Sequence, residues 1–242
     1  MSGKKMTFIM LAMVGLVAFF AGMAFSSASG ETQVSADEAL KKLMEGNRHY
    51  VDDKLTYPAV SDAVKRKSLA NSQKPYAVIL TCSDSRVPPE IIFDKGLGEV
   101  FVIRVAGNIP DSIVIGSIEY AVEHLGSSLV MVLGHERCGA VTAAVESNGQ
   151  GTGSEHIDAI VKAVEPGLQL AKKHCDACTG EPNCLETKKK EFVECVSDAS
   201  ARHVAAMLPG QSKILKDMVA AQKIKIVAAK YDLDDGTVTP FR

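Results

Sequence analysis

Four short runs of hydrophobic residues, separated by longer stretches of mixed polarity, dominate the pattern of this chain. They fall near residues 76–81, 99–104, 128–133 and 224–230. Apolar runs of this length are typical of strands that are buried on both faces, as in parallel sheets. Strands that alternate with helical stretches build layered α/β domains. The pattern therefore predicts a three-layer αβα fold, with a central, mainly parallel sheet of four to five strands and helices on both faces.

Two helical segments matter for the site. Residues 37–50 predict a helical arm ahead of the first strand, and Gly139 begins a second helical pattern directly after Cys138. Two residues outside these helices are also expected to have structural roles. Gly107 is expected in a tight turn at the sheet edge, and Arg104, at the end of its strand, is expected to be structural, as part of an internal ion pair or as a hydrogen-bond donor.

The N-terminus has its own pattern. Lys4 and Lys5 precede an apolar run (6–25) that ends in small residues at 26–30. A basic start, an apolar stretch and a small-residue ending predict a secretory signal peptide over residues 1–28, and a single domain over 29–242. The run is also long enough to be an uncleaved membrane anchor. Either interpretation predicts an exported protein, periplasmic or otherwise outside the cytoplasm, with no membrane contact once the signal is cleaved.

The net charge narrows the possible partners. The formal charge is −2 at pH 7, which gives no support for nucleic-acid binding. The hydrophobic content is 46%, which suits an ordinary globular domain with a sizeable core.

Candidate chemistry lies at the ends of two predicted strands. Cys82 follows the first strand, and His135 and Cys138 follow the third, three residues apart. Two thiolates and one imidazole make a zinc ligand set, and three protein ligands leave the fourth position open, as in catalytic zinc sites. Open α/β sheets place their ligands at the carboxyl ends of strands. We expect Gly134 to turn the chain into His135, and one helical turn to bring His135 and Cys138 to the same side.

Four stretches of the chain resemble one known family, the β-class carbonic anhydrases, and suggest an exported bacterial member. They are Cys-Ser-Asp-Ser-Arg-Val (82–87), Glu-Val-Phe-Val-Ile-Arg-Val-Ala-Gly-Asn (99–108), Ser-Ile-Glu-Tyr-Ala-Val (117–122) and Gly-His-Glu-Arg-Cys-Gly-Ala-Val (134–141). Weaker similarity extends to residues 36–50 and to Tyr-Asp-Leu-Asp-Asp-Gly-Thr-Val (231–238).

The resemblance implies a function and a cofactor. It implies one Zn²⁺ per chain, and reversible hydration of CO2 to bicarbonate and a proton by a zinc-bound hydroxide. Asp84 would accept the hydrogen bond of that hydroxide, and Arg86 would keep Asp84 ionised and off the metal. Val87, Ala106 and Gly139 are the substrate-pocket candidates. A homodimer or tetramer is also implied, with the arm reaching across a partner.

Two other functions remain open from the sequence. An enzyme of the same fold could hydrolyse CS2 or COS, which are linear like CO2. A non-catalytic exported zinc protein is the third possibility, although the presence of both Asp84 and Arg86 argues against it.

The remaining four cysteines lie in a stretch interpreted as a Cys-rich insert at about 172–197, of which residues 172–190 are polar. In an oxidising compartment, Cys175, Cys178, Cys184 and Cys195 are expected to form two disulfides. A nested pairing, Cys175–Cys195 with Cys178–Cys184, would suit an antiparallel helix hairpin. A second zinc site that includes His174, and free thiols, are the alternatives.

Overall fold

The computed structural model describes residues 34–56, 61–147, 150–175 and 188–241. Within them the strands form one five-stranded sheet in the order β2-β1-β3-β4-β5. The strands are β1 (Ala77–Thr81), β2 (Val100–Arg104), β3 (Leu129–His135), β4 (Lys225–Tyr231) and β5 (Val238–Pro240). The first four are mutually parallel and confirm the four predicted runs. The short β5 pairs antiparallel with β4.

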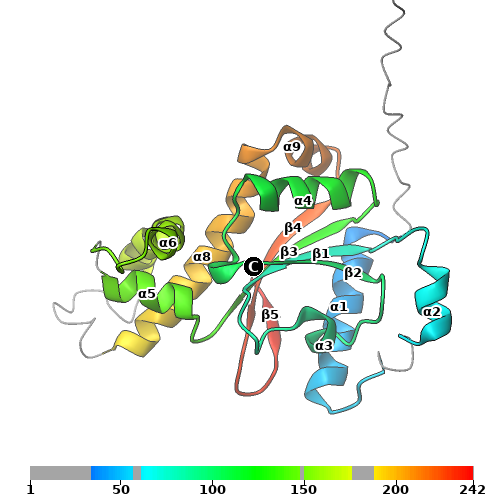
Figure 1. The fold of residues 1–242 in the computed structure, drawn as a ribbon, viewed down its shortest axis with the longest axis horizontal. Helices are drawn as coiled ribbons and strands as arrows, with labels where there is room; N and C mark the ends of the chain where they lie inside the picture. The colour runs from blue at the N-terminus through cyan, green and yellow to red at the C-terminus, as the bar shows by residue number, and fades with distance from the viewer. Residues whose placement is uncertain (1–33, 57–60, 148–149, 176–187, 242) are drawn as a thin grey trace, which may run out of the picture.

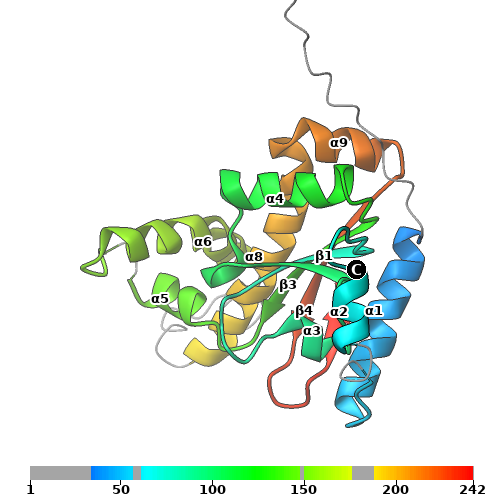
Figure 2. The same cartoon turned by 45° about the vertical axis from the view of Figure 1, so that its right-hand side comes forward.

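Helices cover both faces of this sheet, as predicted (Figure 1 and Figure 2). Those on one face are α4 (Ser112–Glu123), α8 (Lys189–Gln211) and α9 (Lys213–Ala220); those on the other are α1 (Ala36–Val51) and α3 (Pro89–Ile92). The short α2 (Ala63–Ser68) precedes β1 and has no buried residue; it lies at the edge of the molecule in Figure 1. A further pair, α5 (Gly139–Ser147) and α6 (Glu155–His174), packs against α8 beyond the sheet.

The predicted arm is α1, and it packs on its own chain. Ser35 begins the helix by accepting a hydrogen bond from the backbone N–H of Glu38 at 3.2 Å, which satisfies one of the free N–H groups of the first turn. Ala39 and Leu43, one turn apart, are fully buried against the sheet.

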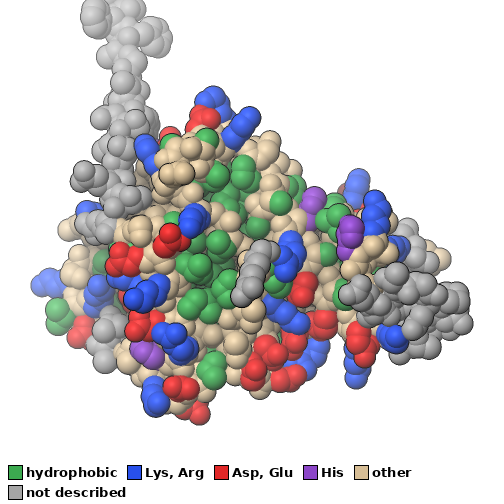
Figure 3. All heavy atoms as spheres, turned by 180° about the vertical axis from the view of Figure 1, so that it is seen from behind, with side chains coloured by type: hydrophobic (Ala, Val, Ile, Leu, Met, Phe, Trp, Pro, Cys, Tyr) green, Lys and Arg blue, Asp and Glu red, His purple; other side chains and the backbone are tan. Residues whose placement is uncertain are grey.

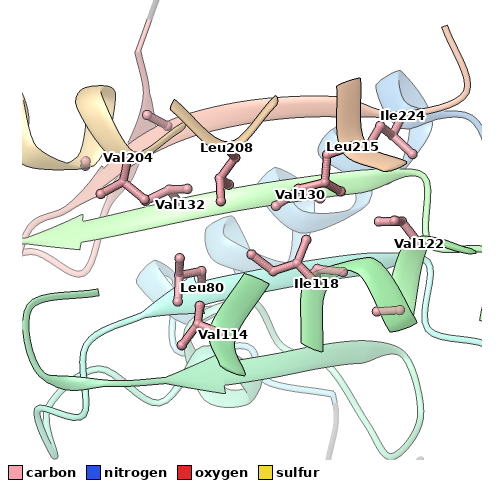
Figure 4. Packing of buried hydrophobic residues seen from close by; sticks show 14 residues of the cluster. Leu80, Val114, Ile118, Val122, Val130, Val132, Val204, Leu208, Leu215 and Ile224 are labelled. Carbon is pink, nitrogen blue, oxygen red and sulfur yellow. The ribbon is translucent and has the colours of Figure 1, made fainter. Parts of the chain in front are cut away.

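The core has one hydrophobic cluster on each face of the sheet. Figure 4 shows the first, in which Leu80, Val130 and Val132 of the strands meet helix residues such as Ile118 and Leu208. The opposite cluster contains Ile79, Met131 and Leu133. Alternate residues of β1 and β3 thus point to opposite faces, and both faces are buried. This explains why the strands read as continuous apolar runs.

Gly134 has a different role from the expected one. It lies inside β3 and does not turn the chain. A Cβ at this position would lie 3.1 Å from the Cβ of Ala201 on α8, which is tighter than ordinary contact. The glycine therefore lets α8 approach the sheet closely.

The Cys-rich region is partly helical. The expected insert at about 172–197 includes the end of α6 and, from Lys189 onward, the beginning of α8. Residues Phe192, Val193 and Val196 of this stretch are buried. The C-terminal part of this stretch therefore packs into the core, beyond the part (residues 172–190) expected to be polar.

Two surface properties complete the description. No helix in the described ranges combines the length and apolar character needed to cross a bilayer. Figure 3, which views the molecule from behind, shows hydrophobic side chains gathered in the middle of the face and charged ones around them.

Candidate metal centre

The three predicted metal ligands meet at the carboxyl edge of the sheet. Cys82 directly follows β1, His135 is the last residue of the neighbouring β3, and Cys138 stands just before α5. The register pairs Thr81 with Leu133, so Cys82 and His135 lie at the carboxyl ends of two neighbouring strands. The three ligand atoms lie within 4.8 Å of one another, and the two Sγ atoms are 4.0 Å apart.

The ligand side chains are buried and oriented. Cys82, His135 and Cys138 are 5%, 1% and 2% exposed. The Nδ1–H of His135 donates to the carbonyl of Glu136 at 2.8 Å. Its Nε2 is buried and has no hydrogen-bond partner among the described residues. A backbone carbonyl that holds one ring nitrogen fixes the tautomer, and the other nitrogen then presents its lone pair to a metal.

The pKa values of the two ligand thiols are shifted in opposite directions. A hydrogen bond from Cys138 lowers the pKa of Cys82, and the same contact, together with burial, raises the pKa of Cys138. The backbone N–H of Gly107 also points at the Cys82 sulfur, at 3.4 Å. Gly107 has φ +73°, so the predicted tight turn is confirmed, and the turn aims an N–H at a ligand sulfur. Two adjacent thiols, one poised to ionise, suit a divalent cation, which binds thiolates.

A carboxylate and a guanidinium lie beside this cluster. Arg86 makes two parallel hydrogen bonds to Asp84, from Nε to Oδ1 at 2.9 Å and from Nη2 to Oδ2 at 2.7 Å. The backbone N–H of Arg86 also donates to Oδ1 at 2.9 Å. Hydrogen bonding to Arg86 holds the pKa of Asp84 well below its usual range, so this carboxylate is ionised at neutral pH.

Arg104 holds the backbone of the first cluster. Its Nε donates to the carbonyl of Cys82 at 3.1 Å, and its Nη2 donates to the carbonyl of Asp84 at 2.5 Å. The expected structural role of Arg104 is thus confirmed. Its two contacts fix the segment that carries both a metal ligand and the acidic side chain.

The connection between His135 and Cys138 differs from the expected helical turn. His135 still belongs to β3, and Arg137 has the left-handed backbone conformation, with φ +49°. The two ligands converge through this sharp turn and not through one turn of a helix. The left-handed conformation is unfavourable for residues with a Cβ, and neighbouring side chains hold Arg137 in it.

Sequence reasoning missed those neighbours. Glu194 Oε1 accepts the backbone N–H of Arg137 at 2.9 Å, and Asp234 pairs with its guanidinium at 2.9 and 3.0 Å. Both are distant in sequence. The weak similarity of residues 231–238 to the family was the only signal that pointed to one of them.

A second cluster of acidic groups does not form a comparable site. Glu136, Asp232 and Asp234 bring carboxylate oxygens within 4.8 Å of one another. However, Glu136 pairs with Lys230 at 3.2 Å, and Asp234 pairs with Arg137. These cations already balance the charge that a metal would otherwise neutralise.

The cysteines beyond the centre are partly described. Cys175, the residue after α6, and Cys195, on α8, form a disulfide, which matches the outer bridge of the nested pairing. Cys178 and Cys184 lie outside the described residues. Cys82 and Cys138 are the free cysteines of the described chain. A second zinc site that uses Cys175 or Cys195 is therefore excluded.

The substrate-pocket candidates occupy three environments. Val87 is fully buried in the cluster beneath β1 and β3. Ala106 stands in a short 3-10 turn (Ala106–Asn108), and Gly139 is exposed at the start of α5. All three follow or flank a ligand-bearing segment.

The fold and the site define a class of protein. A mainly parallel α/β sheet carries one Cys-His-Cys group at its carboxyl edge, with an ion-paired aspartate beside it. Two sulfurs and one nitrogen, buried and close together, fit zinc and leave a coordination position for chemistry. This is a zinc protein of the catalytic type on an open α/β sheet.

Comparison with known sequences identifies the family within this class. The sequence profile described as "Carbonic anhydrase" matches residues 77–238, which include all three ligands. The chain is 39% identical over 202 residues to carbonic anhydrase 2 of Mycobacterium tuberculosis, covering 82% of this chain and 89% of that one. The chain belongs to the carbonic anhydrase family, in its β class.

Solved structures agree on the fold. The β-carbonic anhydrase CcaA superposes with a TM-score of 0.65 at 21% identity, over 84% of this chain and 87% of that one. A tetrameric β-carbonic anhydrase from Sordaria macrospora gives 0.63 at 22% identity, over 84% and 96% of the two chains.

Proposed function

We propose that this protein catalyses the reversible hydration of CO2 to bicarbonate and a proton. The observation that carries the proposal is the Arg86-bound carboxylate of Asp84 beside the Cys82–His135–Cys138 group. A structural zinc site needs no such neighbour. The similarity to carbonic anhydrases over most of the chain supports the same conclusion.

The cofactor would be held by the chain's own three ligands. Cys82 Sγ, Cys138 Sγ and His135 Nε2 would bind one Zn²⁺ per chain. Bound there, zinc supplies a Lewis acid that lowers the pKa of a water to near neutrality. Burial of the ligands keeps the thiolates away from solvent, and the Nδ1–H bond to Glu136 fixes the imidazole.

Asp84 is the proposed catalytic residue. Its ionised carboxylate accepts a hydrogen bond from the attacking oxygen and so orients the lone pair toward carbon. Arg86 occupies both carboxylate oxygens, which keeps Asp84 charged and turned toward the guanidinium. Without Arg86, the free carboxylate would compete for the open metal position.

The substrate is small, linear and apolar. Ala106 is the proposed hydrocarbon surface near the ligand segments, whereas Val87 is buried in the core beneath the strands. The backbone N–H of Gly139, an exposed residue, is the proposed contact for bicarbonate. Hydrolysis of CS2 or COS by the same residues is the second candidate, because these molecules have the shape of CO2.

Assembly and location are part of the proposal. We infer a homodimer or tetramer, supported by the hydrophobic area in Figure 3, since large exposed apolar areas mark interaction sites. We infer export through residues 1–28, supported by the Cys175–Cys195 disulfide, because structural disulfides persist in oxidising compartments. Light scattering and the N-terminal sequence of the periplasmic protein test these two inferences.

Stopped-flow CO2 hydration by the zinc-loaded protein tests the activity. We expect turnover well above that of buffer, and loss of activity when zinc is removed by a chelator. Parallel assays with COS and CS2 separate the candidates. Turnover of COS or CS2 without CO2 hydration would replace the first proposal by the second, and inactivity toward all three would favour a non-catalytic zinc protein.

A further inference from the structure

The turn between His135 and Cys138 connects the metal ligands to two acidic residues from distant parts of the chain. The carbonyl of Arg137, in the middle of this turn, accepts a hydrogen bond from Arg86 Nη2 at 3.3 Å. The same Nη2 also donates to Asp84. The position of the Arg137 peptide therefore bears directly on the guanidinium that holds the catalytic carboxylate.

The Arg137 backbone needs external support. Its φ of +49° is one that residues with side chains rarely adopt, and such conformations persist where surrounding contacts over-determine them. Glu194 of α8 accepts its N–H at 2.9 Å. Asp234, in the turn between β4 and β5, binds its guanidinium through two hydrogen bonds.

The two supports differ in burial. The side chain of Glu194 is 26% exposed, whereas that of Asp234 is 75% exposed. An ion pair at the surface is screened by water and contributes little, while a charge-assisted hydrogen bond away from solvent contributes more. Glu194 is therefore the main support and Asp234 the weaker one.

We propose that Glu194 and Asp234 are positioning residues for this site: they hold the Arg137 peptide so that its carbonyl fixes Arg86, and through Arg86 they orient Asp84. This inference rests on the proposed function. It extends the catalytic group from two neighbouring residues to a chain of contacts that runs from α8 and the β4–β5 turn to the carboxylate.

The test compares Glu194→Ala with Glu194→Gln in the zinc-loaded protein. We expect Glu194→Ala to lower kcat about tenfold, the usual scale for residues that orient a metal site, with KM for CO2 within twofold of wild type and one zinc per chain. Glu194→Gln keeps an oxygen acceptor for the Arg137 N–H, so it should recover most of kcat. Glu146→Ala is the matched control and should leave kcat unchanged. It removes the ion pair between Glu146 of α5 and Lys189, which lies on the same helix as Glu194.

A double-mutant cycle separates positioning from general damage. If Glu194 acts through Arg86, Glu194→Ala should have no further effect on kcat in an Arg86→Ala background. A crystal structure of Glu194→Ala should show Arg86 Nη2 beyond hydrogen-bonding distance from the Arg137 carbonyl. Full additivity of the two kcat effects, or an unchanged Arg86–Arg137 contact, would overturn the inference.

Two further outcomes have defined meanings. An inactive wild-type protein would refute the proposed function, whereas an active wild type with an equally active Glu194→Ala would refute only the positioning role. If Glu194→Ala loses zinc, Asp234→Ala is tested in its place. This variant should lower kcat by less than is expected for Glu194→Ala, and it should have no further effect on kcat in an Arg86→Ala background. An Asp234→Ala effect that adds fully to that of Arg86→Ala would then refute the inference.

Discussion

The guanidinium of Arg86 lies parallel to the carboxylate of Asp84, with Nε 2.9 Å from Oδ1 and Nη2 2.7 Å from Oδ2. The fork geometry uses both oxygens of the acid, and it adds direction to the charge attraction. The side chain of Asp84 is 18% exposed and that of Arg86 is 50% exposed. The acid therefore lies inward, near the metal ligands, while its partner faces solvent.

Asp84→Ala should separate catalysis from metal binding. We expect this variant to keep one zinc per chain and to lose about a hundredfold in CO2 hydration, a typical loss when a group that hydrogen-bonds to the reacting oxygen is removed. Metal analysis and stopped-flow assays on the same preparation measure both quantities. Turnover close to that of wild type would show that Asp84 takes no part in the reaction.

His135→Ala should remove metal and activity together, because two thiolates alone leave zinc without its third protein ligand. Zinc content by atomic emission is the measurement. His203→Ala, at a half-buried position of α8, is the control and should keep full zinc and activity. If the His135 variant retained zinc at one equivalent, the ligand assignment would be wrong.

Gly167→Ala should destabilise the contact between α6 and α8. A Cβ on Gly167 would lie 2.0 Å from Ser200 Oγ and 2.8 Å from Ser200 Cα, so backbone must move. We expect a loss of about 1–3 kcal/mol in the free energy of unfolding, as for overpacked cores. Gly116→Ala on α4 is the control: nothing lies within 4 Å of its added Cβ, and alanine favours a helix. Equal denaturation midpoints for the two variants would contradict the predicted close packing.

The disulfide should contribute to stability and not to turnover. Cys175 and Cys195 are separated by 20 positions, and closing a loop of this size contributes about 3 kcal/mol by restricting the unfolded chain. The double variant Cys175→Ser/Cys195→Ser should therefore unfold at lower denaturant and keep its kcat. If the second expected bridge also forms, thiol counting on denatured, metal-free wild type should find two free cysteines per chain. A count of four would leave the Cys175–Cys195 bridge alone, and six would contradict it.

The sheet and the ligands could be predicted from the sequence because their signals are local. The two central strands, β1 and β3, are buried on both faces and so appear as apolar runs, and Cys82 and His135 stand where these runs end. The antiparallel β5 is three residues long, too short to show any periodicity.

The contacts that shape the site could not be predicted in the same way. Glu194 and Asp234 approach Arg137 from 57 and 97 positions away, and only the folded chain brings them there. The left-handed Arg137 was missed for a related reason. Arginine carries no local preference for that conformation, and the sequence spacing of His135 and Cys138 fits a helical turn equally well.

A third hydrophobic cluster, formed where α5, α6 and α8 pack together and including Val141, Leu168 and Phe192, has a consequence for how the protein matures. It contains the two ligand cysteines, Cys82 and Cys138, and also Cys175 of the disulfide. The same cluster therefore contains a cysteine that must be oxidised and two that must stay reduced. The ligand sulfurs lie 4.0 Å apart, and when no zinc holds them a movement of about 2 Å would let them join. Oxidised glutathione should therefore abolish zinc uptake by the metal-free protein, and zinc added first should prevent this; unimpaired uptake after oxidation would refute the competition. In an oxidising compartment, the order of zinc binding and oxidation should therefore decide whether the protein is active. A chain that binds zinc first should keep its two ligand thiolates, and a chain that is oxidised first should be unable to bind zinc.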